Sequence, residues 1–164
     1  MNKVFVDSGA WISCINKDDK YHKKAFSYLK ELRQNNISLF TSNYVKAETL
    51  TWLKYNTDHQ KAIKAIELWE KAERKQQLKT CWVTKKINKE AEKILKKYKD
   101  HNLSITDCTS FAICRNFEIQ KVFSFDNDFN ILGFLLAPYQ IKEENNINYN
   151  VLYTGNSPEQ DESK

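Results

Sequence analysis

The fold is decided by the stretch Val122-Phe123-Ser124-Phe125-Asp126-Asn127-Asp128-Phe129 and by its counterpart near the start of the chain, Val4-Phe5-Val6-Asp7-Ser8. Each is a short apolar run that ends at an aspartate. A run of this kind is typical of a strand buried on both faces, as in a parallel sheet. The acid that follows it lies at the carboxyl edge of the sheet, where open α/β sheets bind their ligands. We therefore expect Asp7 and Asp126 to lie at that edge.

Three further acids are candidates for the same site: two lie on expected helices and the third, Asp128, lies two residues after Asp126. Asp107 lies in the first turn of a helix, and Glu48 lies inside the helix that follows the second expected strand. Several carboxylates brought together repel one another, so some must take up a proton or a cation must neutralise them. A ligand set of oxygens alone, without histidine or cysteine, selects Mg²⁺ or Mn²⁺. The candidate metal ligands are Asp7, Glu48, Asp107, Asp126 and Asp128, and the first four are also the candidate catalytic residues.

Strands and helices are expected to alternate along the whole chain. This alternation predicts an α/β layer fold with a mainly parallel sheet, in which right-handed crossovers place the strand-end acids at one edge. The apolar stretch 129–136 is compatible with either a helix or a strand. The expected strands are 3–7, 38–41, 78–84, 121–125 and 150–153, and the expected helices begin near Ala10 and cover 21–35, 41–55, 59–77, 85–99 and 104–116.

The composition indicates one folded domain. The chain has 164 residues with only three glycines and two prolines, so no flexible linker is visible. Hydrophobic residues make up 41% of it, which is typical of a globular protein. No apolar run reaches the roughly 18 residues of a membrane span, and the first residues lack the apolar core of a signal peptide. We therefore expect a cytoplasmic protein with no membrane partner.

The cysteines, histidines and lysines indicate which metal sites, redox states and partners to expect. The four cysteines form no C-x-x-C pair and the three histidines have no zinc-ligand spacing, so we expect reduced thiols and no zinc site. The net charge of +5 permits a polyanionic partner but is too small to demonstrate one. Residues 85–99 hold seven lysines. A solvated helix face is the more ordinary interpretation of this stretch, and a contact with a phosphate backbone is the alternative.

Each acid also has an ordinary structural explanation. Asp126 and Asp128 fit a turn after a strand, and Asp107 fits a capping box at the start of its helix. Asp7 fits a cap of the helix that follows it, and Glu48 fits a surface position. The residues that flank these acids favour a common site, because four stretches, each containing an acid, are found together in one chain.

Four stretches together resemble the PIN-domain family, in particular the VapC-type ribonucleases of toxin–antitoxin pairs. The resemblance runs in order from about residue 3 to residue 135, and no single motif in it is specific. The third stretch is the most telling, because the family often has Ser-x-x-Asp-Cys there, as in Ser104-Ile105-Thr106-Asp107-Cys108. The four stretches are VFVDSGAWI at 4–12, TSNYVKAET at 41–49, LSITDCTSFA at 103–112 and VFSFDNDF at 122–129.

The resemblance implies a three-layer α/β/α sandwich with a five-stranded parallel sheet over residues 1–138. It implies a divalent-metal-dependent endoribonuclease that hydrolyses RNA phosphodiester bonds and serves as the toxin of a toxin–antitoxin pair. An RNA substrate, a cognate antitoxin and a homodimer are the implied partners. By position, the four acids of the family match Asp7, Glu48, Asp107 and Asp126. Residues 139–164 match nothing in the family and are expected to form an extension with one edge strand and a disordered tail.

Several details stay open at this level. Asp128 either assists or replaces Asp126. Ser8, Thr106 and Ser124 neighbour the acids and either orient ligands or are ordinary small polar residues near turns. The type of RNA, the number of metal ions and the existence of an antitoxin are not fixed by the sequence.

Other classes fit less well. A dinucleotide-binding fold needs G-x-G-x-x-G after the first strand, where only Gly9 stands. A haloacid-dehalogenase-type phosphatase needs a second aspartate at the position of Gly9, and a receiver domain usually has an adjacent acid pair near its start. The main alternative is a PIN-like scaffold that binds RNA or a protein without cutting, and the intact set of four acids argues against it.

Overall fold

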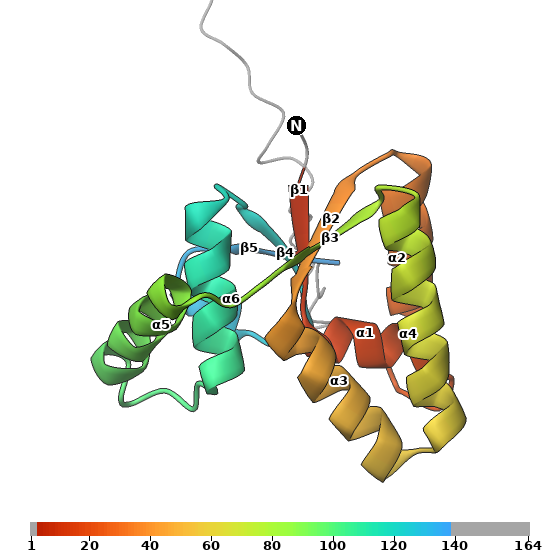
Figure 1. Ribbon diagram of the computed structural model, residues 1–164, viewed down its shortest axis with the longest axis horizontal. Helices are drawn as coiled ribbons and strands as arrows, with labels where there is room; N and C mark the ends of the chain where they lie inside the picture. Colours follow the sequence, from red (N-terminus) through yellow and green to blue (C-terminus); the bar gives the residue numbers. More distant parts are fainter. Residues whose placement is uncertain (1–2, 139–164) are drawn as a thin grey trace, which may run out of the picture.

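The computed structural model describes residues 3–138, and one five-stranded sheet lies at its centre (Figure 1). All of its neighbouring strands are parallel, in the order β3-β2-β1-β4-β5. The predicted parallel α/β sheet is confirmed. The strands are β1 (Lys3–Val6), β2 (Ser38–Ser42), β3 (Leu78–Cys81), β4 (Lys121–Phe123) and β5 (Leu135–Ala137).

Helices cover both faces of the sheet, which gives the expected three layers. Helices α1 to α4 lie on one side and α5 and α6 on the other (Figure 1). The two sides meet where α3 contacts α6, beyond the carboxyl ends of the strands. The helices are α1 (Ser8–Ile15), α2 (His22–Gln34), α3 (Asn43–Asn56), α4 (His59–Arg74), α5 (Lys85–Lys97), α6 (Ile105–Asn116) and α7 (Asp128–Ile131).

The fifth strand differs from the expected one. The apolar stretch 129–136 divides at Gly133, whose φ of 81° reverses the chain between the short helix α7 and strand β5. Strand β5 pairs with β4 in the register Lys121↔Leu135 and completes the sheet. The strand expected at 150–153 and the extension 139–164 lie outside the described residues.

Hydroxyl caps fix where the helices near the carboxyl edge begin. Ser42 accepts a hydrogen bond from the backbone N–H of Val45 at 3.0 Å and so starts α3 directly after β2. Thr84 caps α5. Strand β3 ends at Cys81 instead of the expected residue 84, because its partner β2 ends at Ser42. Ser104 caps α6, as the sequence predicted. These caps place three helix starts at one edge of the sheet.

The strand order reverses beside β1. The chain moves from β1 through β2 to β3 on one side, and returns to β4 and β5 on the other. In open parallel sheets such a reversal leaves a crevice outside the carboxyl ends of the two central strands. Asp7 follows β1 and Asp126 follows β4, so both lie beside this crevice.

Large apolar side chains fill the space between the layers. Trp11, Phe5, Phe111, Phe123 and Phe129 are fully buried, and the ring of Trp11 packs edge-on against that of Trp69 at 5.8 Å. Four free cysteines are also buried within this interior. In the part of the chain that the structure describes, no helix is both long and apolar enough to cross a membrane.

Candidate active site

The predicted site acids lie around the crevice between β1 and β4. Asp7 and Asp126 stand past the ends of neighbouring parallel strands, so they share the carboxyl edge of the sheet. Glu48 comes from the middle of α3, and Asp107 from the first turn of α6. The charges of these acids act on one another. Glu48 and Asp107 both raise the pKa of Asp7, and Glu48 and Asp126 both raise that of Asp107.

Asp7 is the buried centre of the group. Its side chain is 4% exposed, and it makes no side-chain cap to α1, which removes the ordinary explanation for an acid at this position. Its Oδ2 accepts a hydrogen bond from Ser124 Oγ at 3.1 Å, while its buried Oδ1 has no hydrogen-bond partner in the described structure. Burial, followed by the charge of Asp107, raises the pKa of Asp7 to about 7.

Glu48 is exposed and is held by the first residue of α1. Ser8 Oγ donates a hydrogen bond of 2.6 Å to Glu48 Oε1, which ties the start of α1 to the middle of α3. Ser8 is therefore one of the small polar residues that orient an acid. Burial of Val45, Thr49 and Leu53 on the adjoining face of α3 fixes the rotation of the helix and so the direction of Glu48.

Asp107 combines a structural and an electrostatic role. Its Oδ2 accepts hydrogen bonds from the backbone N–H and the hydroxyl of Ser104, at 2.8 and 2.7 Å, in a complete capping box. The capping box therefore exists, but it uses only one carboxylate oxygen. Burial raises the pKa of Asp107 despite these hydrogen bonds, and the charges of Glu48 and Asp126 add to the increase. Its Oδ1 takes no part in the box.

Ser124 connects the two strand-end acids. Its hydroxyl donates to Asp7 Oδ2 and accepts from the backbone N–H of Asp126 at 3.0 Å. Asp126 Oδ1 in turn accepts from the backbone N–H of Asp128 at 2.9 Å, which forms a tight turn at the start of α7. The ring of Phe125 stacks on that of Tyr21 at 4.3 Å, and this contact holds the loop from the other side.

Asp128 is the first residue of α7 and is half-buried, whereas Asp126 is exposed. Burial is the main reason that its pKa is raised, and among the acids only Asp126 contributes, while His101 lowers it. Asp126, by contrast, also acts on Asp107. The structure thus connects Asp126 with the central acids more closely than it connects Asp128.

The acids share one edge and one electrostatic field, but their oxygens do not converge on one point in this conformation. Within residues 3–138, no group of three or more His, Cys, Asp or Glu side chains is gathered closely enough to hold a metal ion as it stands. Serine hydroxyls engage one oxygen each of Asp7, Glu48 and Asp107. Direct ligation by all four acids therefore needs rotation of the exposed side chains, or waters between acid and ion.

The donor set nevertheless fits a divalent cation. Its members are carboxylates without histidine or cysteine, as Mg²⁺ and Mn²⁺ prefer. Asp7 Oδ1 is a buried acceptor without a partner, and such a group is costly unless a donor or cation completes it. Three neighbouring acids keep the local charge negative, so a cation relieves repulsion as well as satisfying this oxygen.

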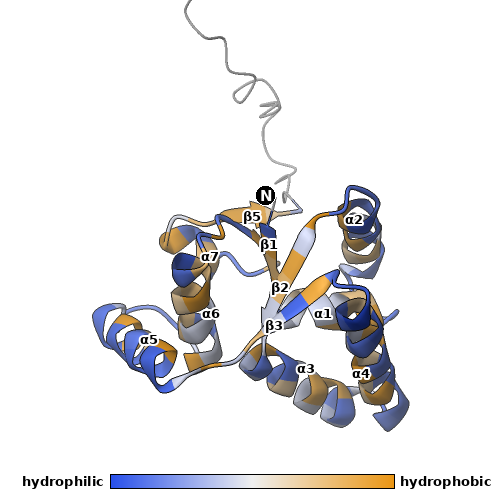
Figure 2. Cartoon of the chain, turned by 45° about the horizontal axis from the view of Figure 1, so that its top comes forward, coloured by the Kyte–Doolittle hydropathy of each residue, from blue (hydrophilic) through white to orange (hydrophobic). Residues whose placement is uncertain are grey.

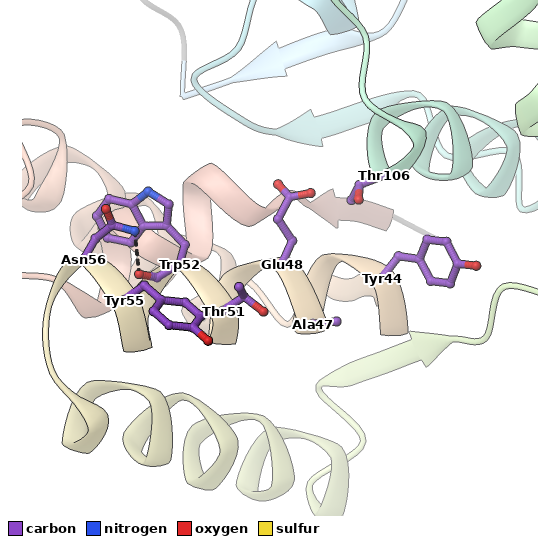
Figure 3. Close-up of a pocket in the computed structure, with 8 residues that line it drawn as sticks. All are labelled: Tyr44, Ala47, Glu48, Thr51, Trp52, Tyr55, Asn56 and Thr106. Carbon is purple, nitrogen blue, oxygen red and sulfur yellow. Dashed lines mark hydrogen bonds between the residues drawn. The ribbon is translucent and has the colours of Figure 1, made fainter.

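A groove along α3 is bordered by one of these acids, Glu48 (Figure 3). It has a volume of about 570 Å³, and both Glu48 and Thr106, the residue before Asp107, lie in its wall. The sequence did not identify this groove, because Thr106 reaches it from a distant segment and the aromatic residues of α3 are equally compatible with a core. Its lining residues are Tyr44, Ala47, Glu48, Thr51, Trp52, Tyr55, Asn56 and Thr106.

A structural hydrogen bond that the sequence did not reveal supports the end of β1. Trp11 Nε1 donates to Thr41 Oγ1 at 3.2 Å, and Thr41 Oγ1 donates to the carbonyl of Val6 at 3.0 Å. All three residues are buried, so the backbone just before Asp7 has little freedom to move. The sequence predicts Thr41 only as part of the second strand or as a helix cap.

In a comparison with protein-family models, residues 4–135 match the PIN domain. Among curated proteins, the 23S rRNA-specific endonuclease VapC20 of Mycobacterium tuberculosis is 31% identical over 137 residues. That alignment covers 80% of this chain and 95% of VapC20. The matched segment contains all five candidate acids.

Solved structures agree on the fold. The crystal structure of M. tuberculosis VapC20, described as a sarcin–ricin loop cleaving toxin, has a TM-score of 0.69 at 30% identity and covers 80% of this chain and 96% of that one. VapBC2 from Rickettsia felis, bound to a DNA fragment from its promoter, has a TM-score of 0.60 at 13% identity, covering 82% and 96%. FitAcB from Neisseria gonorrhoeae has a TM-score of 0.54 at 13% identity, covering 81% and 95%. The last two likenesses concern the fold alone.

Proposed function

The chain belongs to the PIN-domain family, and from that premise we propose that it is a divalent-metal-dependent endoribonuclease that hydrolyses RNA phosphodiester bonds. The observation that carries this proposal is the buried Asp7, which has an unpartnered carboxylate oxygen and feels the charges of Asp107 and Glu48. A scaffold that only binds RNA has no use for a buried acid of this kind, because its repulsion and desolvation destabilise the fold.

We assign the metal-binding role to Asp7, Glu48, Asp107 and Asp126, with Asp7 as the central ligand. When bound, the ion supplies charge neutralisation at the phosphate and lowers the pKa of a water. Ser124 holds Asp7 Oδ2 and leaves Oδ1 available, while Ser8 and Ser104 each hold one oxygen of Glu48 and Asp107. These hydroxyls orient the acids before substrate arrives, which reduces the reorganisation that binding requires.

Asp126 is the fourth acid of this assignment, and Asp128 assists it. The support is electrostatic and geometric, since Asp126 acts on Asp107 and shares Ser124 with Asp7. Asp128 is connected to the group through Asp126, by the hydrogen bond from its backbone N–H and by the charge of Asp126. We propose Mg²⁺ or Mn²⁺ as the ion, because the candidate ligands are all carboxylate oxygens.

The proposed substrate is a structured RNA with unpaired nucleotides. VapC20 is named for its action on 23S rRNA and on the sarcin–ricin loop, so an oligonucleotide of that loop is the first substrate to test. We also propose that the chain is the toxin of a toxin–antitoxin pair, and an adjacent reading frame encoding an antitoxin would support this. Homodimerisation and a cytoplasmic location stay predictions.

Helix α5 supplies the positive charge for a phosphate backbone. Its lysines are exposed, and its apolar side packs on α6, which carries Asp107 (Figure 2). The two acids of α5 are engaged by amides: Glu90 accepts from Asn116 and Glu92 from Asn88. In residues 3–138, no lysine of α5 forms an ion pair within 4.0 Å, so its charge is available to a polyanion.

Replacing Lys93, Lys96 and Lys97 together by glutamine is expected to weaken RNA binding and flatten its salt dependence. For a single strand, removal of one phosphate contact reduces the slope of log K against log salt by about 0.7. Binding measured between low and moderate salt checks this, and Lys23, Lys24 and Lys30 on α2 provide a matched triple substitution on another helix. An unchanged slope would show that the lysines of α5 are solvated and do not contact the RNA.

Metal-dependent cutting of RNA tests the proposed function. Purified protein is incubated with the loop oligonucleotide in Mg²⁺, in Mn²⁺ and in EDTA. We expect cleavage with either metal and none with EDTA. Binding without cleavage under all three conditions would favour the scaffold instead.

A further inference from the structure

The groove along α3 is an extension of the candidate active site and has a distinct lining. Figure 3 shows Glu48 and Thr106 side by side at its wall, with Tyr44 and Tyr55 extending from α3 on either side of Glu48. Glu48 is thus both an acid of the proposed metal site and a wall of the groove. Any molecule that fills the groove lies against the reacting part of the substrate.

Aromatic rings and small polar groups form this lining together. Tyr44, Glu48, Thr51 and Tyr55 follow one stripe of α3 at helical spacing, and Trp52 lies beside them. Tyr55 is 78% exposed, the most exposed of the large apolar side chains in the described structure, although it lines a groove. Such rings, with hydroxyl and amide groups between them, suit planar heteroaromatic bases better than aliphatic side chains.

The surroundings of the groove indicate what occupies it. Tyr55 lies seven residues beyond Glu48, which is about 10 Å along the helix and within reach of a nucleotide next to the reacting phosphate. Helix α5, with its exposed lysines, packs on α6 at the opposite side of the acids. An RNA strand with unpaired bases matches both the lysines of α5 and the rings of the groove. Its phosphates face the lysines and its bases face the rings.

We propose that this groove is a base-stacking subsite for an unpaired nucleotide of the RNA substrate, with Tyr55 and Trp52 as the stacking surfaces. The proposal rests on the proposed ribonuclease function and adds where the substrate lies. Stacking tolerates different bases, so the subsite selects unpaired over paired RNA rather than one sequence. The hydroxyl of Thr51 lines the groove and is available to a base edge. Asn56 Nδ2 donates to the carbonyl of Trp52 at 2.9 Å, which leaves Asn56 Oδ1 as the acceptor for a base (Figure 3).

A double-mutant cycle tests this subsite without requiring cleavage. In an Asp7→Asn background, Tyr55→Leu and Tyr55→Phe are compared for binding to the fluorescently labelled loop oligonucleotide. A set of oligonucleotides carries one abasic site each, at successive unpaired positions. Phe26→Leu is the matched control, since Phe26 is 57% exposed on α2 and lines a separate pocket.

We expect Tyr55→Leu to raise the Kd about tenfold, and Tyr55→Phe to bind like the parent, because leucine removes the stacked ring and phenylalanine keeps it. At one position, an abasic site should weaken binding to the parent but not to Tyr55→Leu, which is the signature of direct contact. In the active protein, Tyr55→Leu should raise the RNA concentration for half-maximal rate and leave the saturated rate nearly unchanged.

The proposal is overturned if Tyr55→Leu and Phe26→Leu bind alike, or if the abasic sites weaken binding equally in both. It is also overturned if Tyr55→Leu instead splits a dimer, measured by light scattering, because the groove then holds a second copy of the chain. Absence of metal-dependent cutting in the wild type is a separate result. That result would contradict the proposed ribonuclease function, whereas the double-mutant binding measurements would still show whether a nucleotide occupies the groove.

Discussion

Asp7→Asn is expected to reduce RNA cleavage by more than about 100-fold. Removal of a residue that only supports a metal ligand costs up to about 100-fold in activity, and loss of the ligand itself should cost more. The substitution keeps the size of the side chain and its ability to accept the hydrogen bond from Ser124. It removes the negative charge from the one acid that is buried at the centre of the group. Single-turnover cleavage of the loop oligonucleotide at saturating protein measures the effect.

The fold of this variant is expected to survive. Burial raises the pKa of Asp7 to about 7 from an unperturbed 3.8, so the ionised carboxylate destabilises the folded state. In EDTA, Asp7→Asn should therefore melt no lower than the wild type at pH 8. Asp18→Asn is a suitable control, because Asp18 is an exposed acid whose carboxylate pairs with Lys61 at the edge of α4. Loss of activity in both variants, or unfolding of the first, would contradict the assignment.

Metal binding and proton binding are expected to compete at Asp7. Addition of Mg²⁺ or Mn²⁺ in place of EDTA should raise the melting temperature at pH 8, since a ligand of the native state stabilises it. Below pH 7 the carboxyl group holds its proton, so the apparent metal affinity should fall by up to about tenfold per pH unit. Thermal melting at several pH values and metal concentrations checks this.

In the metal-free protein, the pH dependence of stability has the opposite sign. Because the pKa of Asp7 is raised on folding, its contribution to stability is full below pH 4 and disappears as the pH rises to about 7. The melting temperature of the wild type in EDTA should therefore fall relative to that of Asp7→Asn over this range. Identical melting curves in EDTA and in excess metal at pH 8 would contradict a metal site at Asp7.

The position of the acids could be predicted because strand ends are visible in the sequence. The runs before Asp7 and Asp126 are short and largely apolar, and parallel strands bring their carboxyl ends to one edge. The cap at Ser104 was predictable for a similar reason, because a hydroxyl residue stands three positions before an acid. Local patterns of this kind contain enough information to place a residue at an edge.

Helix ends were harder to predict. Helix α4 ends at Arg74 instead of the expected residue 77, and the chain turns at Gln76, whose φ of 56° lies in the left-handed region. Asn36 and Glu118 turn the chain in the same way after α2 and α6. Glycine, or less often asparagine, marks such a position, so Gln76 gives no visible stop signal. Helices α2 and α6 nevertheless end within one residue of their expected ends at 35 and 116.

The substrate groove could not be predicted because core and surface patterns on α3 are alike. Val45, Thr49 and Leu53 are buried, whereas Trp52 and Tyr55 line the groove, and both sets recur at helical spacing. Only tertiary packing against α1, α4 and α6 decides which face is covered. For the same reason, the sequence left open whether Ser8 and Ser124 orient the acids, and the structure shows that each donates a hydrogen bond to a carboxylate.

Analysis of the RNA ends produced by the wild type is the most direct test of the central claim. Hydrolysis by water at an acid-bound metal site does not use the 2′-hydroxyl as nucleophile. The products should therefore have 5′-phosphate and 3′-hydroxyl ends, and a 2′-deoxy substitution at the cut should still be cleaved. Cyclic 2′,3′-phosphate ends, or the same products from Asp7→Asn at an undiminished rate, would contradict it.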